Sequence, residues 1–174
     1  MSEPVLVYKG DAIASYGFGD PHPFGLDRHG VFHEELAKAD LGDAIAYATP
    51  GNASVDDLLL FHTARYIDKV SRMSAEGRGF LDDGDTPAMP GIFDAASNVV
   101  GTTLAAVDAI MKGSARRAFV PIGGLHHAGR DCAAGFCVFN DCGVAAEYPR
   151  SPELFPRLFM PLSKRIYYSS VEEQ

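Results

Sequence analysis

Residues 118–128 read Ala-Phe-Val-Pro-Ile-Gly-Gly-Leu-His-His-Ala. The apolar run 118–122 predicts a buried strand of the kind found in parallel sheets, and the glycine pair ends it. Ligands of parallel α/β sheets bind beyond the carboxyl ends of the strands. His126 and His127 follow such an end, and histidine titrates near neutral pH, so this stretch predicts a site of proton transfer. On these residues alone, a buried hydrogen-bonded pair or a metal-ligating pair explains the histidines equally well.

Strands and helices alternate along the chain before this stretch, which predicts an α/β fold. Short apolar runs predict strands at 4–8 and 44–48. The clearest helix is 92–112, where apolar residues recur at three- and four-residue spacing and Gly113 provides a stop.

Three shorter helices are predicted from their starts. Asp27 is expected to cap a helix that runs to about Lys38, with Val31 and Leu36 on its buried face. Ser54 begins a capping-box pattern, and Thr63 can cap the helix that follows. Loops rich in Gly, Pro and Asp are expected at 17–25 and 77–90.

The composition predicts one globular domain with a sizeable core. The chain has 174 residues, of which 47% are hydrophobic and 22% charged. A net charge of −8 argues against nucleic acid and anionic membrane as partners, and no run approaches the ~20 apolar residues of a membrane span. No signal peptide is expected. The three cysteines fit no common zinc knuckle and predict reduced thiols, so we expect a cytoplasmic protein, or a nuclear one in a eukaryote.

Several motifs together resemble one family. Gly-Gly-Leu-His-His-Ala at 123–128, Gly-Phe-Cys at 135–137 and Asn140-Asp141 resemble the signature of the histone deacetylases, a family that includes acetoin-utilisation deacetylases and acetylpolyamine amidohydrolases. Phe-His-Thr-x-x-Tyr at 61–66 and Asp-Thr-Pro-x-x-x-Gly-Ile-Phe-Asp at 85–94 resemble further segments. The resemblance implies a parallel-sheet, Rossmann-like three-layer fold of the arginase/deacetylase kind.

The resemblance also implies roles for individual residues. His126 and His127 would be general base and acid beside a metal-bound water, and Gly135 and Phe136 would line a narrow channel for the acyl-lysine stem. Asp85 would accept hydrogen bonds from the substrate backbone at the channel rim. For Phe136 the other interpretation is core packing, and for Asp85 it is a turn-forming role.

The remaining polar candidates match less closely. Arg28 resembles an arginine that pairs with the product carboxylate, although a surface arginine at a helix start is an equal interpretation. His29, His33 and His62 are expected to be structural or solvated. Packing is expected for two further residues, Tyr16 and Cys137.

The ligands of a zinc site are missing from the sequence. The family takes two aspartates and a histidine from segments that include Asp-x-Asp-x-His-His-Gly-Asp-Gly, and no such segment is present. Residues 148–161 contain four prolines instead. We therefore expect 1–146 to be the N-terminal part of a deacetylase-like domain, truncated before the zinc-ligand strand. Residues 147–174 would be a divergent tail with one strand at 164–169. Glu172 falls near a ligand position, but no zinc is expected to bind tightly.

These observations predict a hydrolase of the deacetylase family that removes acetyl groups from acetyl-lysine peptides or acetylpolyamines. The chain alone is expected to be inactive. The alternative is a non-catalytic protein that pairs with a partner chain through an exposed sheet edge. An arginase-like manganese hydrolase shares the α/β architecture, but it does not explain the Gly-Phe-Cys segment.

Overall fold

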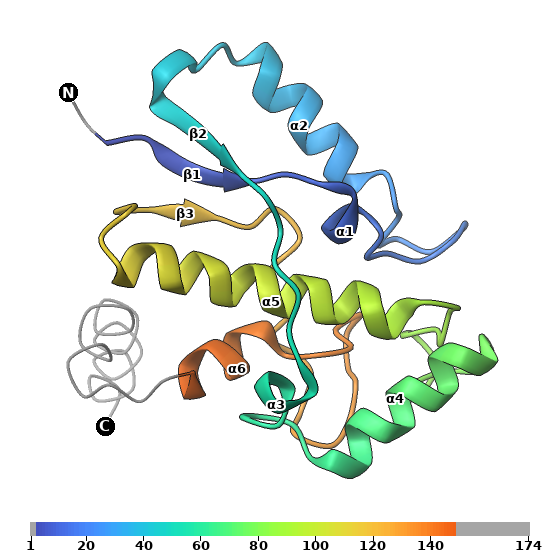
Figure 1. Cartoon of the computed structure of the whole chain (residues 1–174). Helices are drawn as coiled ribbons and strands as arrows, with labels where there is room; N and C mark the ends of the chain where they lie inside the picture. Colours follow the sequence, from blue (N-terminus) through green and yellow to red (C-terminus); the bar gives the residue numbers. More distant parts are fainter. Residues whose placement is uncertain (1–2, 149–174) are drawn as a thin grey trace, which may run out of the picture.

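A parallel sheet lies at the centre of the structure, a computed structural model that describes residues 3–148 (Figure 1). Its strands in the described part are β1 (Val5–Tyr8), β2 (Ile45–Ala48) and β3 (Ala118–Phe119), in the order β2-β1-β3. Both pairings are parallel, as predicted. The predicted tail strand at 164–169 lies outside the described residues.

The third strand is shorter than the sequence predicted. It ends at Phe119, not at Ile122. Proline lacks the amide hydrogen that a strand pairing needs, so Pro121 cannot extend the ladder. The Val120 carbonyl instead accepts a hydrogen bond from the Gly123 amide, 3.1 Å away, and the chain turns there. The loop that carries the histidines therefore leaves the sheet earlier than expected.

Six α-helices and one 3₁₀ turn accompany the sheet in the described part. Three of the predicted starts are confirmed: Ser54 forms a complete capping box, Thr63 caps the next helix, and α5 runs from Ile92. The four-residue helix after Gly10 was not predicted. The elements are α1 (Asp11–Ala14), α2 (Arg28–Lys38), η1 (Gly42–Ala44), α3 (Val55–Leu58), α4 (Ala64–Glu76), α5 (Ile92–Met111) and α6 (Asp141–Glu147).

Helices cover both faces of the sheet. Helix α5 packs beneath it and α2 lies on the other side, which gives three layers (Figure 1). On the α2 side, Phe32 stacks on Phe119 with ring centroids 5.3 Å apart. The predicted extent of α2 is confirmed, with Asp27 in the N-cap position and the helix ending at Lys38, but two details were wrong. Its buried residues are His29 and His33, while Val31 is 50% exposed, and the Asp27 side chain makes no capping hydrogen bond.

Helix α5 is the hub of the core. It contacts β3, α1, α4 and α6, and more than half of its residues are buried. The segment between β2 and α3 crosses α5 at Gly101, where a Cβ would lie 2.2 Å from the Asn52 carbonyl carbon. This close crossing carries α3 and α4 to the side of α5 opposite the sheet (Figure 1). Among the described helices, none is long and apolar enough to cross a membrane.

Candidate active site

The two adjacent histidines lie side by side on an exposed loop that follows β3. The ring centroids of His126 and His127 are 4.3 Å apart, and both residues are exposed, so they are not a buried structural pair. The His126 Nδ1 atom is 2.9 Å from the Gly124 carbonyl oxygen. A carbonyl can only accept, so Nδ1 carries the proton and Nε2 keeps its lone pair. This tautomer is suited to a base, while the catalytic role itself stays a prediction.

A buried carboxylate at the start of α6 holds the histidine loop. Asp141 is 1% exposed. Its Oδ1 accepts a hydrogen bond from the Leu125 amide at 2.6 Å, and its Oδ2 accepts from the Gly124 amide at 2.9 Å and the Thr103 hydroxyl at 2.7 Å. A carboxylate that accepts three hydrogen bonds can remain charged in the interior. Asp141 therefore fixes the backbone immediately before the two histidines.

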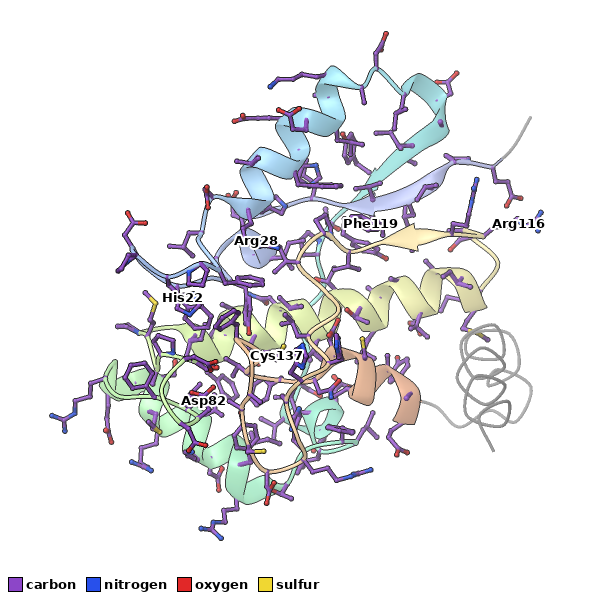
Figure 2. All side chains as sticks on the ribbon, turned by 180° about the vertical axis from the view of Figure 1, so that it is seen from behind. His22, Arg28, Asp82, Arg116, Phe119 and Cys137 are labelled. Atoms are coloured by element: carbon purple, nitrogen blue, oxygen red, sulfur yellow. The ribbon has the colours of Figure 1, made fainter. Side chains whose placement is uncertain are left out.

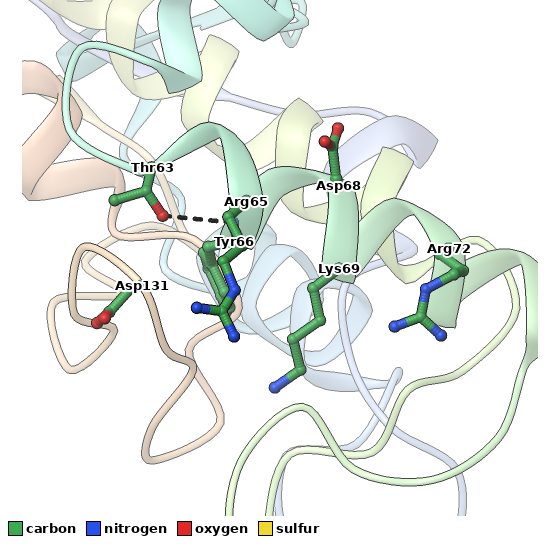
Figure 3. Close-up of a pocket in the computed structure, with 7 residues that line it drawn as sticks. All are labelled: Thr63, Arg65, Tyr66, Asp68, Lys69, Arg72 and Asp131. Carbon is green, nitrogen blue, oxygen red and sulfur yellow. Dashed lines mark hydrogen bonds between the residues drawn. The ribbon is translucent and has the colours of Figure 1, made fainter.

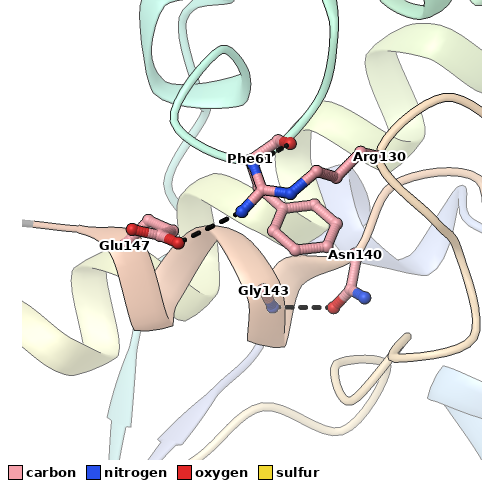
Figure 4. A network of polar contacts seen from close by, with 5 residues as sticks. All are labelled: Phe61, Arg130, Asn140, Gly143 and Glu147. Carbon is pink, nitrogen blue, oxygen red and sulfur yellow. Dashed lines mark hydrogen bonds and ion pairs between the residues drawn. The ribbon is translucent and has the colours of Figure 1, made fainter.

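The neighbouring Asn140 holds the same loop from the other side. Its Nδ2 donates to the carbonyl oxygens of His126 and Ala128, at 3.1 and 2.8 Å, and its Oδ1 caps α6 through the Gly143 amide (Figure 4). Its own amide donates to His62 Nε2 at 2.9 Å. Burial lowers the pKa of His62 to about 4, so this buried imidazole stays neutral and accepts the bond.

An arginine ties the far end of α6 to the same region. Arg130 donates to the Phe61 carbonyl at 3.0 Å and to Glu147 at 3.2 Å, and its guanidinium lies 4.8 Å from the centre of the Phe61 ring (Figure 4). A Cβ at Gly143 would lie 2.7 Å from that ring. Arg130 thus tethers the histidine loop both to α6 and to the segment that precedes α4.

The predicted channel residues lie against the second histidine. Gly135 and Phe136 both have positive φ, 55° and 68°. A Cβ at Gly135 would be 3.2 Å from the His127 ring, so a larger residue would displace the imidazole. The left-handed conformation is costly for Phe136, roughly 1–2 kcal/mol, and must be held by its surroundings. Phe136 is half-buried and so does not belong wholly to the core.

Tyr16 supplies part of that support. Its hydroxyl donates to the Phe136 carbonyl at 2.6 Å and accepts from the Val138 amide at 3.0 Å. Burial raises the Tyr16 pKa far above its ordinary value, which keeps the hydroxyl protonated. Packing was the role expected for this residue. The structure adds two hydrogen bonds that hold the strained segment.

The rim aspartate lies exposed in a turn that another aspartate organises. Asp82 Oδ1 accepts hydrogen bonds from the backbone amides of Gly84, Asp85 and Thr86. Burial alone would raise the pKa of Asp82, but hydrogen bonds with the side chains of Asp85 and Thr86, together with those from the Gly84 and Thr86 amides, outweigh burial and lower the pKa. The turn-forming role therefore belongs to Asp82, and the Asp85 carboxylate is left at the surface. The Thr86 hydroxyl also accepts from the Phe136 amide at 3.2 Å, which joins this turn to the channel.

His22 connects three loops beside Phe136. Its Nδ1 accepts from the Phe24 amide at 3.0 Å, so Nε2 carries the proton and donates to the Asp85 carbonyl at 3.0 Å. Its ring packs edge-on against Phe136, with centroids 4.7 Å apart. Figure 2 shows His22 and Asp82 close to the segment that carries Cys137.

Arg28 lies behind this cluster. Its guanidinium stacks over Phe24 at 4.3 Å from the ring centre, and Phe24 in turn lies 6.5 Å from Phe136. Arg28 is exposed, and in the described part of the chain its contact is this aromatic face. The structure therefore does not bring Arg28 against the two exposed histidines, and its product-binding role stays a prediction.

The other singled-out side chains are buried. The side chains of His29 and His33 lie on the buried face of α2, so neither residue is solvated. Three of their ring nitrogens have no hydrogen-bond partner in the described region. Cys137 is buried beside Phe136, and burial raises its pKa, which suits a packing role.

The described residues do not fit a zinc ion. Zinc needs about three nitrogen, sulfur or oxygen ligands from the protein. Within residues 3–148, no three His, Cys, Asp or Glu side chains are close enough to hold a metal ion together. Glu172, which the sequence places near a ligand position, lies outside the described residues.

The sequence matches the model of the histone deacetylase domain over residues 22–160. The chain belongs to the histone deacetylase family. Among curated relatives, the acetoin utilization protein AcuC of Bacillus subtilis is 37% identical over 155 residues, which are 85% of this chain and 40% of that protein. Histone deacetylase clr6 of Schizosaccharomyces pombe is 27% identical over 82% of this chain and 37% of its own length. This member of the family thus spans about 40% of the length of the curated relatives it matches.

The fold of this deacetylase-family chain also matches a solved structure. The HD domain of HDA15 superposes with a TM-score of 0.72 at 24% sequence identity, over 83% of this chain and 43% of that one. The predicted α/β class with a parallel deacetylase-like sheet is therefore confirmed. The assignment of roles to single residues is a separate matter, because a shared fold does not by itself assign function.

The sequence reasoning missed the residues that support the site. Asn140 and Asp141 were part of the recognised motif, but their hydrogen bonds to the histidine loop were not predicted. The signal available was an Asn-Asp pair directly before an apolar helical run, which is typical of an N-cap. Packing was expected for Tyr16, but no sequence signal pointed to its hydrogen bonds, because its partner Phe136 lies 120 residues away along the chain.

Proposed function

We propose that this chain forms the part of a deacetylase that receives an acetylated amine, on an acetyl-lysine peptide or an acetylpolyamine. One observation carries the proposal. The His127 ring lies against Gly135, and Phe136 is the next residue along the chain. An aliphatic stem packed along Phe136 would place its acyl group beside the exposed imidazoles. The relatives of this chain, among them a histone deacetylase, support this substrate class.

The chain's own residues would handle the proton. With its Nδ1 proton donated to Gly124, His126 presents the lone pair of Nε2 for accepting a proton from water, and His127 would supply one to the leaving amine. Zinc, where the family binds it, supplies water activation. The described residues offer no donor set for it, so no step is assigned to the metal. We also propose that the protein acts in the cytoplasm.

Acetyl transfer to water is expected to require more than these 174 residues. A fluorogenic acetyl-lysine reporter should show no turnover with the chain alone, whether zinc is added or removed. Turnover that a chelator abolishes would contradict this expectation, because it would reveal a metal site formed by this chain.

Binding without turnover tests the channel directly. A labelled acetyl-lysine peptide should bind more tightly than its unacetylated form when fluorescence anisotropy is measured. Phe136→Ala should weaken the acetylated complex about tenfold, the effect of losing roughly 1.4 kcal/mol of aromatic contact. Phe119→Ala is the matched control, since Phe119 lies on the α2 side of the sheet (Figure 2). Equal affinity for both peptides would refute the proposed channel.

A further inference from the structure

A basic groove runs along α4, and neither of the two exposed histidines is among its lining residues. Arg65, Lys69 and Arg72 are spaced four and three residues apart, and their side chains project from the same side of the helix (Figure 3). The groove has a volume of about 910 Å³. Its lining residues are Thr63, Arg65, Tyr66, Asp68, Lys69, Arg72 and Asp131. These cations are gathered in one hollow although the protein as a whole carries a net charge of −8.

Among the described residues, two of the three cations form no internal ion pair, and the third forms only an exposed one. Lys69 Nζ donates to the Leu81 carbonyl at 2.9 Å, a bond that holds its position but leaves its charge unbalanced. Arg72 pairs with Glu76 at 3.2 Å on the exposed surface, where such a pair is weak. The Arg65 side chain is exposed and makes no hydrogen bond or ion pair with any residue of 3–148. Asp68 and Asp131 also line the groove. The Asp68 carboxylate projects from the other side of α4 (Figure 3), and within residues 3–148 neither carboxylate forms an ion pair with the three cations.

An acidic hollow lies at the turn that Asp82 organises. It has a volume of about 380 Å³ and is lined by Asp82–Asp85 and by 133–135. Lys69 contacts the residue immediately before Asp82, so the basic groove and the acidic turn adjoin. The segment 131–135 begins at the basic groove, continues along the acidic hollow and ends at Gly135, against His127. The acidic hollow therefore reaches Gly135, and the basic groove adjoins this hollow through Leu81 and through segment 131–135.

We propose that α4 binds acidic residues on one side of the acetylated lysine, so that the preferred substrate is an acetyl-lysine peptide with an acidic flank. This inference rests on the proposed function of the channel. Arg65 and Arg72 lie about 10 Å apart along the helix, which three residues of an extended peptide span. Guanidinium groups bind carboxylates through paired hydrogen bonds. The acidic turn repels the same flank, so the two surfaces together orient the peptide.

The test uses the full chain and two labelled acetyl-lysine peptides of equal length, measured by fluorescence anisotropy. One peptide carries three glutamates on one side of the lysine, tested on each side in turn, and the other carries three glutamines. The glutamate peptide should bind about tenfold more tightly at low salt, and the difference should shrink as salt is raised. The double variant Arg65→Gln and Arg72→Gln should remove the difference. Arg116→Gln, an exposed arginine beyond the far end of α5, should keep it (Figure 2).

The outcomes separate the two proposals. If the glutamate and glutamine peptides bind equally, or if the double variant keeps the preference, the groove proposal is overturned while the channel proposal stands. If an unacetylated glutamate peptide binds as tightly as the acetylated one, the acetyl group is not recognised, and the channel proposal fails together with the groove proposal. If no acetylated peptide binds at all, the proposed function itself is refuted.

Discussion

Individual side chains at the start of α6 determine how the two exposed histidines are held. Asp141 accepts three hydrogen bonds, two of them from the backbone amides that precede the histidines. Hydrogen bonds to a charged group contribute more than neutral ones, and a buried donor that loses its acceptor pays the full cost of desolvation. The geometry of the exposed imidazoles thus depends on a carboxylate that never reaches the surface.

Asp141→Asn should lower the free energy of unfolding by about 2–3 kcal/mol. The amide group of asparagine would turn a donor toward a backbone N–H or toward the Thr103 hydroxyl, and one hydrogen bond would be lost. Urea unfolding measures the effect. Asp43→Asn, a matched change at an exposed position, should cost less than 0.5 kcal/mol, the usual range for surface sites. Equal losses in the two variants would show that Asp141 has no special structural role.

Secondary-structure elements meet at His62, between α3 and α4. Its imidazole accepts a hydrogen bond from the residue that caps α6, so it joins two helical segments that are far apart in the sequence. The bond requires a neutral ring, and burial enforces that state. The connection between these elements is consequently sensitive to pH.

Stability should fall as the pH is lowered through the window between 6.5 and about 4. The folded pKa of His62, about 4, lies below the ordinary value, so the unfolded chain binds more protons in this window. The stabilisation that the neutral His62 ring provides is complete above pH 6.5 and is lost as the pH falls toward 4. Between pH 7 and pH 5 the loss should be about 2 kcal/mol from His62. Burial also lowers the pKa values of His29 and His33, which adds a loss of the same sign.

Urea unfolding of the His62→Gln variant at both pH values isolates the contribution of His62. The variant should be less stable at pH 7 and should lose about 2 kcal/mol less between pH 7 and pH 5 than the unmodified chain. If the variant and the unmodified chain lose the same free energy of unfolding between pH 7 and pH 5, a group other than His62 must cause the loss.

At the scale of the whole molecule, the sheet formed within residues 3–148 has two covered faces and an open edge at β3. Among the described residues, β3 pairs only with β1, and its outer edge faces a groove of about 340 Å³. Apolar residues of α5 and of the segment around β3 dominate this groove, among them Val107, Ile110 and Val120. An unpaired strand edge beside an apolar groove favours association with another chain. This is the observation behind the alternative function, a protein that pairs through its sheet edge.

The chain should therefore associate with a second copy of itself as its concentration rises, and light scattering across a dilution series measures this. Ile110→Lys places a charge in the groove and should shift the chain toward the monomer. Leu41→Lys is the matched control, because Leu41 is an exposed apolar residue at a distance from β3 in the fold. A monomer at every concentration would contradict association through the edge.

Local sequence patterns predicted much of this architecture. The capping residues Ser54 and Thr63, the periodicity of 92–112 and the parallel strands were all readable, because each depends on neighbours within a few residues. The buried face of α2 and the end of β3 were not predicted correctly. Histidines replaced Val31 as the buried residues of α2, because packing against the sheet overrides the expected preference of each residue type.

The amino-acid sequence alone established the family, the fold class and the presence of an adjacent histidine pair and a Gly-Phe segment, because short motifs preserve the order of residues along the chain. It could not reveal that Gly135 lies against His127, that Tyr16 holds Phe136, or that α4 presents its cations beside an acidic turn. Those relations join residues that are distant in sequence. They arise only when burial of the apolar faces of α5 and the sheet brings the loops together.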